Sequence, residues 1–263
     1  MIELICVDVD GTMVGSSGDV ASETWVATAR MRARGVRLAI CSGRPAFGKT
    51  RGYAERLDAD GWHMFQNGAS VIRLPLGTTH SRPIEPALVR ALIARARATG
   101  RSLELYGDTG YAVETDVPRA REHARLLGLP FAVSDLLAFG PVVRAQWLLP
   151  HDEVEAVMAE PHDGLTLSHS LSPVMPDASF LNVTPAGVDK GAAVRAVAQA
   201  YDVPLERVMM VGDGANDVPA LRIVGAAVAM GNAERAARDA ARFHVGDVDQ
   251  GGLVEALTLA LTL

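Results

Sequence analysis

Four short apolar runs along the chain have the pattern of buried β-strands. Most positions of each run are apolar, rather than every second one, which is typical of a strand covered on both faces. Segments with helical spacing follow them, such as Ser22 to Arg34, which ends at Gly35. The pattern predicts parallel strands linked by helices, and therefore an α/β fold. The four runs are Leu4 to Val9, in which Asp8 is the first polar residue, Val36 to Cys41, Val208 to Val211, and Ala226 to Met230.

The pattern changes in the middle of the chain. Asn67-Gly68 lies between two apolar runs and predicts a hairpin turn, so an antiparallel element is expected there. Separate helices and strands with frequent Gly and Pro then continue to about Thr184. The parallel pattern returns with a helix from Lys190 to Tyr201. We therefore predict a Rossmann-like parallel-sheet core, residues 1–82 and 185–263, with an inserted α+β module at 83–184.

Composition and charge narrow the classes of protein that the chain can belong to. Of its 263 residues 49% are hydrophobic, and its net charge is -6, so it has no positive field for nucleic acid or an anionic membrane. No apolar stretch reaches membrane-spanning length, and residues 1–14 lack the basic start of a signal peptide. Cys6 and Cys41 end apolar strands and do not indicate a disulfide framework. We expect a cytoplasmic monomer or homodimer that binds neither nucleic acid nor membrane.

Acidic residues follow two of the predicted strands. Asp8 and Asp10 end the first strand, while Asp213 and Asp217 come directly after the strand at 208–211. The carboxyl ends of parallel strands meet at one edge of a sheet, where open α/β sheets bind ligands. Four carboxylates there would repel one another unless a cation lay among them, and Mg²⁺ suits a site that also holds phosphate. Taken singly, either acidic segment fits an ordinary polar turn equally well.

Two further segments offer groups that bind phosphate. Ser42-Gly43-Arg44 ends the second strand with a hydroxyl, a flexible backbone amide and a guanidinium. Ser42 and Pro45 fit the start of the next helix equally well. Lys190 opens the helix after the insert and is one of only two lysines in the chain, the other being Lys49. An exposed lysine at a helix start is the alternative interpretation.

Residues 43–50 also match the phosphate-binding loop pattern G-x-x-x-x-G-K-[ST]. In that motif the helix starts near the Gly-Lys pair, whereas Pro45 predicts a helix that starts at its own position and runs to Leu57. Lys49 would then lie one turn inside the helix. A nucleotide-binding loop would also leave Asp8, Asp10 and the second acidic segment without a role.

These segments, in this order, resemble the motifs of the haloacid dehalogenase superfamily of phosphohydrolases. Asp8-Val9-Asp10-Gly11-Thr12 looks like the first motif, Ser42-Gly43-Arg44 the second, Lys190 the third, and the segment from Gly212 to Asp217 the fourth. The position of the insert after Asn67-Gly68-Ala69, and Met230-Gly231-Asn232-Ala233, are similar to the Cof-type branch, whose members carry a mobile α+β cap of type C2. Pro219 departs from that branch, which often has methionine there.

The resemblance implies a role for each motif residue. Asp8 would be the nucleophile, and Asp10 the general acid that then acts as general base. Mg²⁺ would be held by Asp8, the backbone carbonyl of Asp10 and Asp213, with Asp217 in support. Phosphate oxygens would be bound by Ser42, Gly43 and Lys190, with Asn216 nearby. The implied activity is hydrolysis of a small phosphorylated metabolite, with sugar phosphates as the expected class.

The insert is where we expect substrate choice to reside. Its polar candidates for facing the substrate are Tyr111, Arg119, Arg121 and His123, together with Arg44 from the second motif, and each insert residue fits a solvated surface equally well. A phosphomutase with the same nucleophile is an alternative function, as is a catalytically silent binding protein, although the latter is expected to lack Asp8, Asp10 or Lys190. The segment from Gly212 to Leu221 also resembles P-type ATPases, but those pumps lack a carboxylate at the position of Asp10.

Overall fold

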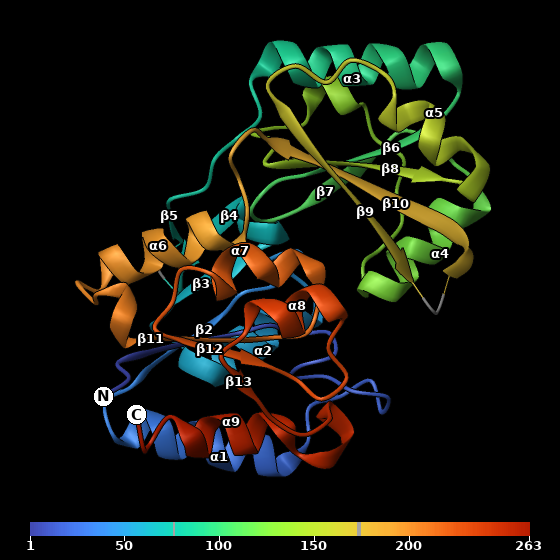
Figure 1. Cartoon of the computed structure of the whole chain (residues 1–263). Coiled ribbons are helices and arrows are strands. Elements are labelled where there is room, and N and C mark those ends of the chain that lie inside the picture. Colours follow the sequence, from blue (N-terminus) through green and yellow to red (C-terminus); the bar gives the residue numbers. More distant parts are fainter. Residues whose placement is uncertain (76, 173–174) are drawn as a thin grey trace. The chain divides into compact units, whose positions relative to one another are not determined.

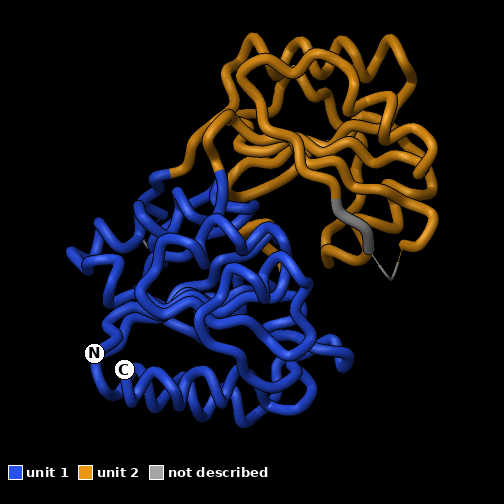
Figure 2. Tube along the Cα trace, viewed as in Figure 1, with its two compact units in different colours: residues 1–44, 50–80, 189–263 blue, residues 45–49, 81–188 orange. Residues whose placement is uncertain are grey.

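The computed structural model describes residues 1–75, 77–172 and 175–263. Contacts divide the chain into two compact units (Figure 2). The core unit contains residues 1–44, 50–80 and 189–263, and the insert unit contains residues 45–49 and 81–188. Among the described residues, no helix is both long and apolar enough to cross a membrane.

A five-stranded parallel sheet forms the centre of the core unit, in the order β13-β12-β11-β1-β2. Its central strands are buried because neighbours on both sides and helices on both faces exclude water from their apolar runs. β1 pairs with β11 so that Val7 lies opposite Val211, which brings the carboxyl ends of the two strands together. The predicted α/β fold with a parallel sheet is confirmed. The strands are β1 (Leu4–Val7), β2 (Arg37–Ile40), β11 (Val208–Gly212), β12 (Ala226–Ala229) and β13 (Phe243–His244).

Helices cover both faces of this sheet (Figure 1). α1 and α9 lie side by side on one face, and α6, α7 and α8 lie on the other. α2 contacts α1 through the rings of Tyr53 and Trp25, whose centroids are 6.4 Å apart. The helices are α1 (Ser22–Ala33), α2 (Lys49–Asp58), α6 (Lys190–Ala200), α7 (Val218–Leu221), α8 (Arg235–Ala240) and α9 (Gly252–Leu259), with 3₁₀ turns η1 (Gln66–Gly68), η4 (Leu205–Arg207), η5 (Ala215–Asp217) and η6 (Val248–Gln250).

The start of α2 corrects one expectation. The helix begins at Lys49 and not at Pro45. Before it, Gly48 has a φ of 63°, which is outside the helical region, and the ring of Phe47 stacks on that of Tyr106 with centroids 6.4 Å apart. Because the helix begins at Lys49, its position gives no argument against a nucleotide-binding loop. That interpretation fails for another reason: Lys190, and not Lys49, is the lysine that lies among the carboxylates.

The predicted hairpin around Asn67-Gly68 is confirmed. β3 (Trp62–Phe65) and β4 (Ser70–Arg73) pair in antiparallel fashion, and β5 (Thr78–Thr79) adds a third strand to this small sheet. An isolated parallel bridge joins Cys41 to Met64 and so places the hairpin beside the carboxyl end of β2. The turn of the hairpin therefore lies next to the segment Ser42-Gly43-Arg44.

The insert unit is an antiparallel sheet with helices, in the strand order β7-β6-β8-β10-β9. One face of the sheet is apolar, with Leu103, Leu105 and Trp147 packed under α3 and α5. Alternate residues point to the opposite face, where Glu104 accepts hydrogen bonds from Tyr106 and Gln146. The elements are β6 (Ser102–Tyr106), β7 (Tyr111–Val113), β8 (Arg144–Leu149), β9 (Leu165–Ser172), β10 (Met175–Pro185), α3 (Pro86–Thr99), α4 (Pro118–Leu127), α5 (Val154–Met158), η2 (Leu136–Ala138) and η3 (His151–Glu153).

Candidate active site

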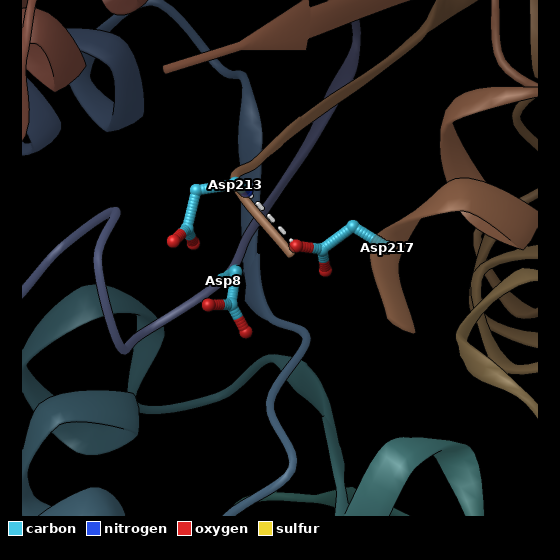
Figure 3. A group of neighbouring side chains, drawn as sticks. All are labelled: Asp8, Asp213 and Asp217. Carbon is cyan, nitrogen blue, oxygen red and sulfur yellow. Dashed lines mark hydrogen bonds between the residues drawn. The ribbon is translucent and has the colours of Figure 1, made fainter. Parts of the chain in front are cut away.

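Asp8 and Asp213 lie at the ends of two adjacent strands. Asp8 follows β1 and Asp213 follows β11, and the backbone N–H of Asp8 donates to the carbonyl oxygen of Val211 over 3.0 Å. Asp217, from the 3₁₀ turn that follows, completes a group in which one carboxylate oxygen from each residue lies within 4.8 Å of the others. Figure 3 shows the three side chains converging from these segments. Parallel pairing thus brings together residues that are far apart in the sequence.

Lys190 joins two of these carboxylates. Its Nζ donates to Oδ1 of Asp8 and to Oδ1 of Asp217, in each case over 2.6 Å. The ammonium is completely buried, which is rare for a lysine unless it is paired. The start of α6 is held by Asp189, whose side chain accepts from the backbone N–H of Ala192 over 2.7 Å as an N-cap.

Negative charge exceeds positive charge in this group. Burial raises the pKa of Asp8 well above its usual range; Lys190 opposes this rise, and Asp217 and Asp213 add to it. Burial and then Asp217 raise the pKa of Asp213 to about 7. The pKa of Lys190 is raised as well, because Asp217 and Asp8 outweigh the effect of its burial. Three carboxylates around one ammonium form a set of oxygen donors that suits a hard divalent cation.

Asp217 and Thr12 fix the loop after β11 and the side chain of Asp213. Oδ2 of Asp217 accepts from the backbone N–H groups of Asp213 and Gly214, over 3.0 Å and 2.9 Å. Its other oxygen is bonded to Lys190, so Asp217 fixes both the lysine and the loop after β11. Thr12 Oγ1 donates to Oδ1 of Asp213 over 3.0 Å and orients that carboxylate.

Asp10 stands apart from the other three carboxylates, of which Asp8 and Asp217 are buried and Asp213 is half-buried. Its side chain is 62% exposed and pairs with the guanidinium of Arg44, whose Nε donates over 2.8 Å and whose second nitrogen donates over 2.5 Å. Such a two-pronged pair holds the carboxylate in one orientation. Arg44, which we expected to contact substrate, is therefore engaged with the expected acid/base residue.

The expected phosphate-binding residues of the second and fourth motifs line neighbouring loops of the core unit. Ser42 is buried, and its Oγ accepts from the backbone N–H of Arg44 over 3.1 Å. Asn216 lies in the 3₁₀ turn after β11, where its Nδ2 donates to Oδ1 of Asn67 over 3.0 Å. A Cβ placed on Gly43 would lie 3.1 Å from the same Asn67 oxygen, so Gly43 and Asn216 are both close to Asn67.

The polar candidates of the insert lie in the insert unit and are engaged there. Arg121 forms an ion pair with Asp116, and Arg119 lies 3.7 Å from Asp177. His123 is buried rather than a surface residue, and its Nδ1 lies 2.9 Å from Oε2 of Glu104. The hydroxyl of Tyr111 donates to the carbonyl oxygen of Pro130 over 3.4 Å.

Three residues near the site were not among the expected site residues. They are Thr12, Asn67 and Asn232. Asn232 donates from Nδ2 to the carbonyl oxygen of Gly11 over 2.8 Å and accepts from the backbone N–H of Val248, and so ties the loop after Asp10 to two other segments. Asn232 follows β12, and a polar residue after an apolar strand is the signal that could have identified it.

Comparison with known proteins identifies the family of the chain. The sequence matches the haloacid dehalogenase-like hydrolases over residues 5–130 and 166–257. It is 26% identical over 239 residues to an HMP-PP phosphatase of Cronobacter sakazakii. The alignment covers 89% of this chain and 85% of the relative. An HMP-PP phosphatase of Escherichia coli O157:H7 is 25% identical over 235 residues, with the same two coverages.

Solved structures show the same fold. A haloacid dehalogenase-like hydrolase from Bacteroides thetaiotaomicron has a TM-score of 0.86 at 25% identity and covers 98% of this chain and 99% of its own. The sugar phosphatase BT4131 is described as a member of subclass IIB of the same superfamily. It has a TM-score of 0.83 at 20% identity, and the match covers 99% of this chain and 100% of BT4131. The matched residues span the core and most of the insert, and the chain belongs to the haloacid dehalogenase-like hydrolases.

Proposed function

We propose that the protein is a Mg²⁺-dependent phosphatase that hydrolyses a small phosphorylated metabolite through an aspartyl-phosphate on Asp8. Membership of the hydrolase family and the names of the curated relatives, which are phosphatases, support the reaction class. The single observation that carries the assignment is the buried group in which Asp8 lies beside Lys190 and within reach of Asp213. Asp8 therefore has the ammonium group of Lys190 beside it, and together with Asp213 and Asp217 it could bind a metal ion.

Mg²⁺ would be held by Asp8, Asp213 and the backbone carbonyl of Asp10. Asp217 would support the ion, since its oxygens already accept from Lys190 and two backbone N–H groups. When bound, the ion neutralises charge on the carboxylates and on the phosphoryl group, which is the main requirement of phosphoryl transfer. The excess of carboxylates over ammonium groups, together with the raised pKa values of Asp8 and Asp213, supports this assignment.

The protein's own residues would then carry two steps. In the first, an Asp8 carboxylate oxygen forms a bond to phosphorus while the ester bond breaks, and Asp10 gives a proton to the leaving oxygen. In the second, Asp10 takes a proton from water, and the water oxygen attacks phosphorus and displaces Asp8, which releases inorganic phosphate. Lys190, Ser42, the backbone N–H of Gly43 and Asn216 would hold the phosphoryl oxygens during both steps.

The class of substrate is proposed from the comparisons. The curated relatives are HMP-PP phosphatases, and a structural neighbour is a sugar phosphatase. Small phosphorylated metabolites are the class that includes both, and sugar phosphates are the first group to test. A panel of phosphorylated metabolites assayed for phosphate release identifies the substrate.

The decisive test measures Mg²⁺-dependent release of phosphate from an aryl phosphate. Asp8→Asn is expected to abolish turnover, because the amide cannot form the acyl phosphate, whereas the matched substitution Asp60→Asn at an exposed position should leave it unchanged. Turnover in water labelled with heavy oxygen should place one labelled oxygen in each phosphate released, while a mutase would release little. Full activity of Asp8→Asn would rule out the nucleophile.

A further inference from the structure

The turn Gln66-Asn67-Gly68 has an unfavourable backbone conformation. Three consecutive residues have positive φ angles, 54° at Gln66, 56° at Asn67 and 94° at Gly68. Glycine tolerates this region freely, asparagine tolerates it better than most residues, and glutamine does not. Strained backbone of this kind persists only where surrounding contacts hold it, and it is common at functional sites. The contacts of this turn therefore indicate its functional role.

Backbone hydrogen bonds join the turn to the second motif. The N–H of Gln66 donates to the carbonyl oxygen of Arg44, and the N–H of Asn67 donates to that of Ser42, each over 3.0 Å. The turn thus holds the chain on both sides of Gly43. The Asn67 side chain lies against Gly43 itself, since a Cβ there would be 3.1 Å from Asn67 Oδ1.

The same turn reaches two other motifs of the core unit. Oδ1 of Asn67 accepts from Nδ2 of Asn216 over 3.0 Å, across 149 positions of sequence. A Cβ on Gly68 would lie 2.4 Å from the carbonyl oxygen of Asp189, the residue before Lys190. One three-residue turn therefore contacts the segments that carry Gly43, Asn216 and Lys190, all of which are proposed to bind phosphate.

We propose that Asn67 is a positioning residue for the phosphoryl group. Its side-chain oxygen fixes the amide of Asn216, and its side chain packs on Gly43, so both donors keep one orientation relative to Asp8. Without that oxygen the Asn216 side chain can rotate, and the donors no longer converge on one point. This inference rests on the proposed function, because it concerns the binding of the transferred group.

The test compares Asn67→Gly with Asn67→Ala, in kinetics and in thermal stability. Both substitutions remove the side-chain oxygen, so kcat/KM for an aryl phosphate should fall roughly tenfold in both, as for the loss of one hydrogen bond, and inorganic phosphate should inhibit more weakly. Asn67→Gly suits the left-handed backbone and should keep its Tm, whereas Asn67→Ala should lower it. Wild-type kcat/KM in Asn67→Gly would overturn the proposal.

Asn216→Ala completes a double-mutant cycle. If Asn67 acts through Asn216, the double variant should be no less active than the less active of the two single variants, so the two losses of roughly tenfold should not multiply. A loss equal to the product of the two single effects would show that the residues act independently and would overturn the proposal. Asp202→Ala is the matched control, because Asp202 is an exposed non-glycine residue with a φ of 55° outside these motifs. It should lower Tm and leave kcat/KM unchanged.

Calorimetric binding of inorganic phosphate in the presence of Mg²⁺ separates the two proposals. A wild-type protein that binds phosphate but hydrolyses no ester would refute the phosphatase assignment alone, and weaker phosphate binding by Asn67→Gly would still support the role of Asn67. Equal phosphate affinity in wild type and Asn67→Gly would overturn that role, whatever the wild type hydrolyses.

Discussion

At the scale of single residues, the site depends on charges that are buried together. Lys190 places one ammonium between Asp8 and Asp217, and both of its hydrogen bonds measure 2.6 Å. Taking charges out of water is costly, so each member of such a group depends on its partners. Removing one partner therefore affects both the stability of the fold and the chemistry of Asp8.

Lys190→Met is expected to lower both activity and stability. Loss of the ammonium leaves two buried carboxylates without their cation, and breaking a buried ion pair in this way costs about 3–5 kcal/mol. The kcat for an aryl phosphate should fall about 10²-fold or more, as for loss of a charge-stabilising donor. Urea denaturation and steady-state kinetics measure the two effects. Lys49→Met, at an exposed position, is the control and should change neither; an active Lys190→Met would contradict the assignment.

His63 gives a prediction for the dependence of stability on pH. Its Nδ1 accepts from the backbone N–H of Ile40, its Nε2 lies 2.8 Å from the carbonyl oxygen of Asp58, and burial lowers its pKa to about 4. Between pH 6.5 and about 4 the unfolded chain binds a proton that the folded protein does not. The free energy of unfolding should therefore decrease by roughly 3 kcal/mol as the pH falls through this window.

Denaturant titrations between pH 4 and 7 test this expectation. His63→Gln keeps an acceptor and a donor but does not titrate, so its stability should depend less on pH in this range. His169→Gln, at an exposed position of β9, should retain the dependence of the wild type. Equal slopes in wild type and His63→Gln would show that other groups cause the loss of stability.

At the scale of elements, the start of α6 is positioned by close packing against α7. Gly191 follows Lys190, and a Cβ placed on it would lie 2.6 Å from the carbonyl oxygen of Pro219. Backbone atoms cannot move aside as a flexible side chain can. The first turn of α6 therefore fits against α7 only with glycine here, and this contact sets the position from which Lys190 reaches Asp8.

Gly191→Ala should separate α6 from α7 and reduce activity. Overpacking of this kind costs about 1–3 kcal/mol, and the displaced Lys190 should lower kcat/KM. Gly52→Ala in α2 is the matched control, since nothing lies within 4 Å of its Cβ position; it should raise stability by about 0.5–1 kcal/mol without affecting turnover. Thermal denaturation and steady-state kinetics of both variants test this expectation. A Gly191→Ala variant that is more stable than the wild type and fully active would show that α6 packs against α7 without glycine at this position.

At the scale of the whole molecule, a ligand that binds only the folded chain links stability to function. The proposed Mg²⁺ ligands come from segments at opposite ends of the sequence, Asp8 after β1 and Asp213 after β11. The unfolded chain does not hold these residues together. Binding of the ion should therefore stabilise the core unit as well as support turnover.

Mg²⁺ at 100 times its Kd should raise the free energy of unfolding by about 2.7 kcal/mol, and a chelator should reverse this effect and abolish turnover. Asp213→Asn should lose the stabilisation by Mg²⁺, yet the metal-free variant should be at least as stable as the wild type, because one carboxylate is removed from a group with excess negative charge. Thermal denaturation with and without Mg²⁺ measures both effects. Equal stabilisation of wild type and Asp213→Asn would exclude Asp213 as a ligand.

The apolar runs and the polar residues behind them were enough to predict the parallel sheet, the inserted α+β module and the meeting of Asp8 with Asp213. These are consequences of local pattern, because a buried strand needs an apolar run and parallel strands end at a common edge. The elements that the pattern did not predict include α8 and β13. Both are short, six and two residues, and so carry little periodic signal.

Contacts between distant side chains were decided by the tertiary structure alone. The pairing of Lys190 with Asp8 spans 182 positions, and that of Asn216 with Asn67 spans 149. The engagement of Arg44 with Asp10 is a further example, and the start of α2 at Lys49 was likewise not predicted by the local pattern. A local pattern states that a residue is polar and lies after a strand, but its partner depends on how loops from separate strands pack. Packing and hydrogen bonding in the folded chain select that partner, because only there are the loops held within bonding distance.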